Sequence, residues 1–210
     1  MAVNPMLRRS VEGWKEVFGT WMSDPDRQGS VYTSITFDYR RVAGSLDIEP
    51  FLDDVVATAP RHPLFIRHLA FRALDVGPPT GFFRHLVVEA KGEHAGHLDV
   101  KHRGITLVGN LARLYAVRLG GTEKSTLSRI AAASAAGLIS DEDRVGLQEA
   151  FRLLWQIRLD HQVRCARNGI APDDYVDPKE LGPIARRGLK EAFSIIDAQQ
   201  QTVSLEFGIR

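Results

Sequence analysis

The second half of this chain of 210 residues is a succession of helical patterns, and this feature limits the fold more than any other. Apolar residues recur there at helical spacing, and glycine-containing turns separate one pattern from the next. The predicted helices cover residues 105–119, 126–136, 141–168 and 178–206. Because each apolar face must be buried against another element, these segments predict a helical bundle.

The first half mixes helical patterns with strand patterns. Helices are expected at residues 9–21, 50–59 and 63–74, and strands at residues 31–40, 82–90 and 97–101. The last two strands flank a turn around Lys91-Gly92-Glu93, which is typical of a β-hairpin. The sequence therefore predicts an α+β protein that is mostly α. The sequence pattern changes near Gly77-Pro78-Pro79. We therefore expect one domain over residues 1–75 and another over residues 76–210.

Composition excludes several classes of protein. The formal net charge is +1, so the chain as a whole has no bulk attraction to nucleic acid or to an acidic membrane. Cys165 is the one cysteine, which fits a reducing compartment and predicts a cytoplasmic location. The longest apolar run, residues 130–139, falls short of the roughly 20 residues that span a bilayer. The N-terminus does not read as a signal peptide.

Charged residues stand at positions that packing alone does not explain. On a strand over residues 97–101, Asp99 and Lys101 share one face, and Gly104 can then end that strand in a turn. Arg113 lies between the apolar positions of the following helix, where an arginine needs a partner. Arg158, His161 and Gln162 follow helical spacings of three and four, so they lie on one side of one helix, as the residues of a solvated face also do.

The order of these residues resembles a known family. The matching motifs are Gly81-Phe82-Phe83, Leu98-Asp99-Val100-Lys101, Gly104-Ile105, Leu111-Ala112-Arg113, Thr126-Leu127-Ser128-Arg129, Glu149-Ala150-Phe151 and Arg158-Leu159-Asp160-His161-Gln162. From Phe82 onward the chain resembles the nucleotidyltransferase substrate-binding domain. That domain is the helical partner of the catalytic domain in bacterial proteins similar to PII uridylyltransferases, and a looser version occurs in glutamine synthetase adenylyltransferases.

Residues 4–74 resemble the closing part of the catalytic domain in the same family. The matching positions are Asn4-Pro5, Trp14, Trp21, Phe37-Asp38-Tyr39-Arg40 and Val42-Ala43-Gly44. The resemblance implies the rear of a polymerase-β-like fold before the helical bundle. It also implies that the full-length family uses Mg²⁺ and a nucleoside triphosphate, because two metal ions on paired carboxylates hold the transferred phosphate.

The paired carboxylates themselves are absent from this sequence. Gly29-Ser30 is followed by Asp38, but the next alternate position is Arg40; Gly44-Ser45 is followed by the adjacent pair Asp53-Asp54, whose side chains would diverge on a strand. In the family, this motif lies upstream of the point where the chain begins. The chain therefore looks like a C-terminal half that does not catalyse alone, binds no cofactor tightly and works with a catalytic segment in cis or in trans.

The resemblance gives roles to single residues. Asp38 matches the third catalytic carboxylate, steadied by Arg40, and would be solvent-accessible and face the same cleft as Asp99 and Lys101. A structural Asp–Arg pair is the alternative. The family shows an acid where this chain has Ser45. A cleft for the nucleotide or the protein substrate would be lined by Arg113, Arg129, Arg158, His161 and Gln162 and would attract a phosphate ion. Solvated helix faces are the alternative.

No metal site is predicted. His94, His97, Glu93, Asp99 and His102 are close in sequence, but no cysteine joins them and neither zinc-finger nor zincin spacing is present. Cys165 reads as a buried, inert thiol. Asp173, Asp174 and Asp177 read as turn-forming acids that cap the last helix rather than bind calcium.

These observations predict the substrate-binding half of a nucleotidyltransferase that moves a nucleoside monophosphate from a triphosphate onto an acceptor, with a regulatory protein as the expected acceptor. The alternative is a noncatalytic module for protein interaction in signalling, in which the catalytic carboxylates were lost. Binding to nucleic acid is disfavoured by the charge and by the lack of an aromatic-basic surface pattern.

Overall fold

The computed structural model describes residues 8–25, 38–79 and 86–209. This part of the chain is mostly helical and carries one small antiparallel sheet, which confirms the predicted α+β, mostly α class. Its helices are α1 Val11–Ser23, α3 Glu49–Val56, α4 Pro63–Leu74, α5 Thr106–Arg118, α6 Thr126–Ala135, α7 Asp141–Arg167 and α8 Pro183–Phe207. The strands are β1 Leu98–Asp99 and β2 Tyr175–Val176.

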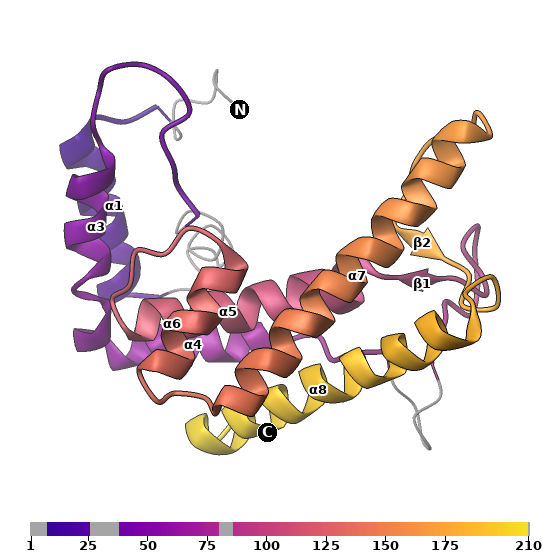
Figure 1. The fold of residues 1–210 in the computed structure, drawn as a ribbon. Helices are drawn as coiled ribbons and strands as arrows, with labels where there is room; N and C mark the ends of the chain where they lie inside the picture. Colours follow the sequence, from indigo (N-terminus) through magenta and orange to yellow (C-terminus); the bar gives the residue numbers. More distant parts are fainter. Residues whose placement is uncertain (1–7, 26–37, 80–85, 210) are drawn as a thin grey trace.

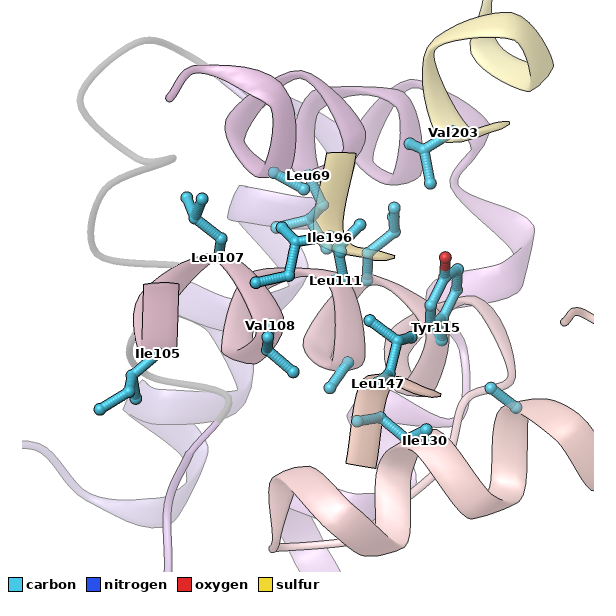
Figure 2. Close-up of a cluster of buried hydrophobic side chains, with 14 of the residues drawn as sticks. Leu69, Ile105, Leu107, Val108, Leu111, Tyr115, Ile130, Leu147, Ile196 and Val203 are labelled. Atoms are coloured by element: carbon cyan, nitrogen blue, oxygen red, sulfur yellow. The ribbon is translucent and has the colours of Figure 1, made fainter. Parts of the chain in front are cut away.

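Helix α5 is the centre of the fold. Most of its residues are buried, on every side of the helix, as expected for a helix surrounded by protein. It packs against α4, α6 and α8. Figure 2 shows side chains from these elements meeting around α5, with Leu69 of α4, Ile130 of α6, Leu147 of α7 and Ile196 of α8 among them. A polar side chain on α5 therefore has little access to water and needs a partner within the protein.

The two longest helices, α7 and α8, pack against each other and diverge at one end, where the sheet lies between them (Figure 1). The Ser140 hydroxyl caps α7 by accepting the Asp143 N–H, and the Asp143 carboxylate accepts the Ser140 N–H in return. This capping box satisfies N–H groups at the start of the helix, and α7 begins at the predicted residue, Asp141. Helix α8 begins at Pro183 rather than Pro178, because residues 175–181 are taken up by β2 and a turn.

Two buried glutamines of α8 are paired with groups on other elements. Tyr115 Oη donates to Gln199 Oε1 at 3.1 Å. Gln200 Nε2 donates to the carbonyls of Ala73 and Val76 at 2.7 and 2.9 Å, so α8 caps the C-terminal end of α4. These contacts fix α4 against the bundle that follows it in the sequence.

The predicted strands need correction. In the part that the structure describes, residues 97–101 contribute only Leu98 and Asp99 to a strand, which pairs with Val176 and Tyr175 and not with residues 86–90. The chain does reverse after residue 90, since Glu89 N–H donates to His97 O and Gly96 N–H to Glu89 O. The predicted strand over residues 31–40 lies outside the described residues except for its end, Asp38–Arg40, which forms a turn and an irregular segment. Residues 80–85 also lie outside them.

The sequence predicted that Gly104 ends a strand, and this is wrong: Gly104 lies in a single π-helical turn, η4 Lys101–Ile105, that leads into α5. A Cβ atom added at Gly104 would lie 2.9 Å from Leu154 Cδ2 and 3.3 Å from Phe193 Cε1. A larger residue at this position would have to displace the Leu154 side chain, because η4 packs closely against α7 and α8.

Candidate functional site

Two arginines from different helices hold one carboxylate. Arg113 of α5 donates from Nη2 to Asp38 Oδ2 at 2.6 Å, and Arg129 of α6 donates from Nη1 to Asp38 Oδ1 at 2.5 Å. Asp38 lies before α3, more than 70 residues from either arginine. We call these three residues the Asp38 cluster. Short, charge-assisted bonds of this kind are the strongest hydrogen bonds in proteins.

The arginines of the Asp38 cluster are much less exposed than its carboxylate. The side chain of Arg129 is 6% exposed and that of Arg113 15%, whereas Asp38 is 37% exposed. Burial raises the pKa of Asp38, but the hydrogen bond and positive charge of Arg113, together with those of Arg129, outweigh it, so that the pKa lies below its ordinary value of 3.8. The site thus places two largely buried cations against one exposed carboxylate.

A second set of polar contacts adjoins the Asp38 cluster. Asp53 of α3 accepts hydrogen bonds from Tyr39 Oη and from Lys124 Nζ, the latter at 2.9 Å. Lys124 also lies 3.9 Å from the centre of the Tyr39 ring. Burial and the hydrogen bond to Asp53 raise the pKa of Tyr39, so this phenol stays protonated. Nothing in the sequence singled out Lys124, because it lies in a loop without a repeating pattern.

Two buried polar atoms near the site have no hydrogen-bond partner among the described residues. Within the described residues, Arg113 Nε is buried and has no hydrogen-bond acceptor, and Glu123 Oε2 is buried without a donor. Arg113 Nη1 donates to Asn110 Oδ1 at 2.9 Å, and Arg129 Nε donates to the Glu123 carbonyl at 2.8 Å. A buried N–H without an acceptor costs about 1–3 kcal/mol, so the spare N–H of Arg113 calls for an explanation.

The other predicted cleft residues gather elsewhere, around an acidic loop. Arg158 Nε donates to Asp174 Oδ1 at 2.6 Å, and Gln162 Nε2 donates to the same oxygen at 3.1 Å. Lys101 Nζ lies 3.5 Å from Asp174 Oδ2. His161 Nε2 lies 2.7 Å from Asp173 Oδ1. We call this set the loop cluster. It ties the segment before β2 to α7, so Asp173 and Asp174 neutralise charges that the sequence had assigned to a ligand.

The two clusters share no hydrogen bond or ion pair among the described contacts. The loop cluster lies beside the sheet and the C-terminal half of α7, whereas the Asp38 cluster is formed by α5, α6 and the segment before α3 (Figure 1). Asp38 is exposed, as predicted, but it is held by two arginines. The single cleft expected from the sequence is therefore two separate sites, and only the first is built from two arginines that converge on one point.

Asp99 and Lys101 do not share a strand face, because the strand ends at Asp99. The Asp99 carboxylate accepts the His102 N–H at 2.8 Å and lies 2.9 Å from His102 Nδ1, so it pairs with a residue in the first turn of η4. Arg40 is exposed. His94, which the sequence placed near possible metal ligands, stacks on Tyr175 with ring centres 3.6 Å apart.

The helical part of this arrangement matches a known family. Residues 63–207 match the family described as "Putative nucleotidyltransferase substrate binding domain". The chain belongs to this family. Comparisons with curated proteins and with solved structures found no match. The matched range begins at the first residue of α4 and ends at the last of α8, so it contains both arginines of the Asp38 cluster, while Asp38 precedes it.

Two further findings concern the substrate-binding domain and the residues described before it. No group of three or more histidine, cysteine, aspartate or glutamate side chains that could hold a metal ion occurs among the described residues. In the same part of the chain, no helix has the length and hydrophobicity to cross a membrane. The division of the chain at residue 75 and the assignment of the site residues stay predictions.

Proposed function

We propose that this chain is the substrate-binding half of a nucleotidyltransferase that transfers a nucleoside monophosphate from a triphosphate to an acceptor. A catalytic segment, in cis or in trans, supplies the carboxylates for Mg²⁺. The resemblance to PII uridylyltransferases supports a regulatory protein of a bacterial cytoplasm as the acceptor. In this role the chain itself binds and orients the nucleotide, and it carries out no bond-breaking step alone.

One observation carries the proposal: Arg113 and Arg129 converge from α5 and α6 on a single anion at a point that solvent reaches. The planar guanidinium group suits bidentate contacts to phosphate as well as to carboxylate. Each arginine is fixed by a further contact, Arg113 by Asn110 and Arg129 by the Glu123 carbonyl, so the pair is held in place before a ligand arrives. Preorganisation of this kind lowers the cost of binding.

A different feature of the same cluster favours the alternative, a noncatalytic interaction module. Both oxygens of Asp38 accept hydrogen bonds from arginines, and a metal ion would have to compete with two positive charges for them. On this alternative, Asp38 serves only to fasten the segment before α3 to α5 and α6. Asp38 as a third catalytic carboxylate stays a prediction, and our proposal for the chain does not depend on it.

Calorimetry separates the two functions. Wild type and Arg113→Ala are titrated with ATP and with UTP in the presence of Mg²⁺. Loss of one charge-assisted contact removes about 1.5–3 kcal/mol, so we expect the affinity of Arg113→Ala to fall by roughly 10- to 150-fold. Arg144→Ala is the matched control, because Arg144 pairs with Asp141 and Gln148 of its own helix, α7; its affinity should equal that of the wild type.

Arg113 is largely buried, so folding of the variant is checked by circular dichroism. Arg113→Lys serves as a second variant that keeps the charge and loses the planar fork. Absence of saturable nucleotide binding by the wild type, or equal affinity of wild type and both Arg113 variants, would contradict the proposal and favour the interaction module.

A further inference from the structure

The anion held by Arg113 and Arg129 belongs to the chain itself. We propose that Asp38 is an internal ligand of an oxyanion site, and that a phosphate group binds between the two arginines by displacing the Asp38 side chain. The ligand class is a phosphate oxyanion, either free or as the phosphate chain of a nucleotide. This inference deepens the proposed function and rests on it, because it uses the same arginine pair.

The site offers more donors than Asp38 uses. Asp38 takes one terminal nitrogen from each arginine, and Arg113 Nε is left without an acceptor in the described structure. A carboxylate has two oxygens and one charge, whereas a terminal phosphate has three oxygens and close to two charges. A phosphate at this point can therefore engage both arginines and still present an oxygen toward Arg113 Nε. Such bidentate contacts explain why arginine is common in phosphate sites.

The structure also allows Asp38 to leave without opening the core. Its side chain is 37% exposed, and residues 40–47 after it are all exposed. Tyr39 stays anchored by its hydrogen bond to Asp53 and by packing against the core. Rotation of the Asp38 side chain toward solvent thus disturbs neither Tyr39 nor the helices. The arginines, by contrast, are fixed on α5 and α6 and cannot follow it.

A tethered carboxylate competes with ligand in a predictable way. If Asp38 occupies the arginines about nine-tenths of the time, the site is open for the remaining tenth, and the apparent affinity for an external phosphate is reduced about tenfold. Removing the charge of Asp38 should therefore raise the apparent affinity for phosphate about tenfold. The same tether keeps a carboxylate between the two largely buried arginines when no ligand is present, which offsets part of the cost of burying their charges.

The test compares Asp38→Asn with wild type by calorimetry, with inorganic triphosphate and ATP as separate probes. We expect Asp38→Asn to bind both probes about tenfold more tightly than the wild type. Asp53→Asn is the matched control, because it removes one negative charge from the neighbouring contact with Lys124 but none from the arginine pair. Its affinity should stay within about twofold of the wild type. Equal tightening in both variants would show general electrostatics and overturn the inference.

The outcomes separate this inference from the proposed function. If ATP binding depends on Arg113 but Asp38→Asn binds no more tightly, the internal-ligand inference fails and the proposed function stands. If Asp38→Asn binds triphosphate more tightly but ATP binds no better than triphosphate, the internal ligand stands and recognition of a nucleoside fails.

Should Asp38→Asn fail to fold, the wild type provides the same answer. Carbon NMR of the Asp38 carboxyl should show its pKa moving up toward the ordinary value of 3.8 when triphosphate saturates the site, because the carboxyl has lost its arginine partners. An unchanged pKa at saturation would overturn the inference.

Discussion

Asp38 joins the segment before α3 to the central helix by charge, and this makes its contribution to stability depend on pH. Its pKa is lowered in the folded protein, so the ionised form is stabilised by folding. That contribution is fully present above the ordinary pKa of 3.8 and is lost as the pH falls through the lower, folded value. We expect the difference in unfolding free energy between wild type and Asp38→Asn to be constant near neutral pH and to shrink below about pH 4. Urea denaturation at several pH values measures it; a difference that grows in acid would contradict the pairing.

Arg158 illustrates how the structure reverses an expectation from sequence. The family resemblance implied ligand contacts for Arg158, His161 and Gln162, and on that basis Arg158→Ala would weaken binding and leave stability unchanged. The structure gives Arg158 an internal partner, Asp174, and both side chains are largely buried. We now expect Arg158→Ala to lose about 1–3 kcal/mol of stability, or roughly 2–10 °C in melting temperature, with nucleotide affinity unchanged.

The control for Arg158 lies on the same helix. Arg164 is exposed and lies 3.9 Å from Glu180, so Arg164→Ala should change stability by less than about 0.5 kcal/mol. Thermal melting and calorimetry of both variants test this expectation. Weaker nucleotide binding by Arg158→Ala at an unchanged melting temperature would contradict it and show that the loop cluster binds the nucleotide.

At the scale of elements, local patterns predicted helices well and strand pairing poorly. Helix α4 has the predicted bounds, and α7 begins at the predicted residue, Asp141, since helical spacing and capping are local properties. The sheet depends on a partner for β1 that lies more than 70 residues away, and no local pattern identifies Tyr175 and Val176 as that partner. The π-helical turn of η4 also has no sequence signature, because packing against Leu154 and Phe193 selects it.

The close packing of η4 can be tested with alanine substitutions at two glycines, which should change stability in opposite directions. Gly104→Ala places a Cβ atom 2.9 Å from Leu154 Cδ2, and such overpacking costs about 1–3 kcal/mol. Gly109→Ala adds a Cβ atom with nothing within 4 Å in helix α5, where alanine is favoured by about 0.5–1 kcal/mol. The melting temperature should therefore fall for Gly104→Ala and rise for Gly109→Ala. A stable Gly104→Ala variant would show that η4 does not need this close approach.

At the scale of the whole molecule, the sequence singled out charged residues that the structure pairs, but not how they are grouped. Arg113 was recognised because an arginine among apolar positions of a helix needs a partner, and the structure supplies that partner from a segment far away in sequence. Which arginines share an anion depends on how α5, α6 and α7 pack, and spacing within one helix cannot report it. The chain thus separates into a paired-arginine site and a loop that is fastened internally.

The proposed function leaves the catalytic step to another segment, so this chain alone should transfer no nucleoside monophosphate. Purified chain, Mg²⁺, labelled UTP or ATP and a PII-type acceptor should give no labelled acceptor, because the sequence lacks carboxylates at alternate positions for two metal ions. The same mixture with a catalytic segment of the family added should give label transfer that falls in Arg113→Ala and not in Arg144→Ala. Metal-dependent transfer by the chain alone would contradict this account.

The central claim is that Arg113 and Arg129, and not the loop cluster, receive the phosphates of the substrate. Nitrogen-edited NMR of the arginine Nε–H groups during a titration with ATP tests it most directly. The account predicts saturable shifts at Arg113 and Arg129 and none at Arg158 or Arg144. Shifts at Arg158 with Arg113 and Arg129 unmoved would contradict it and place the substrate beside the acidic loop.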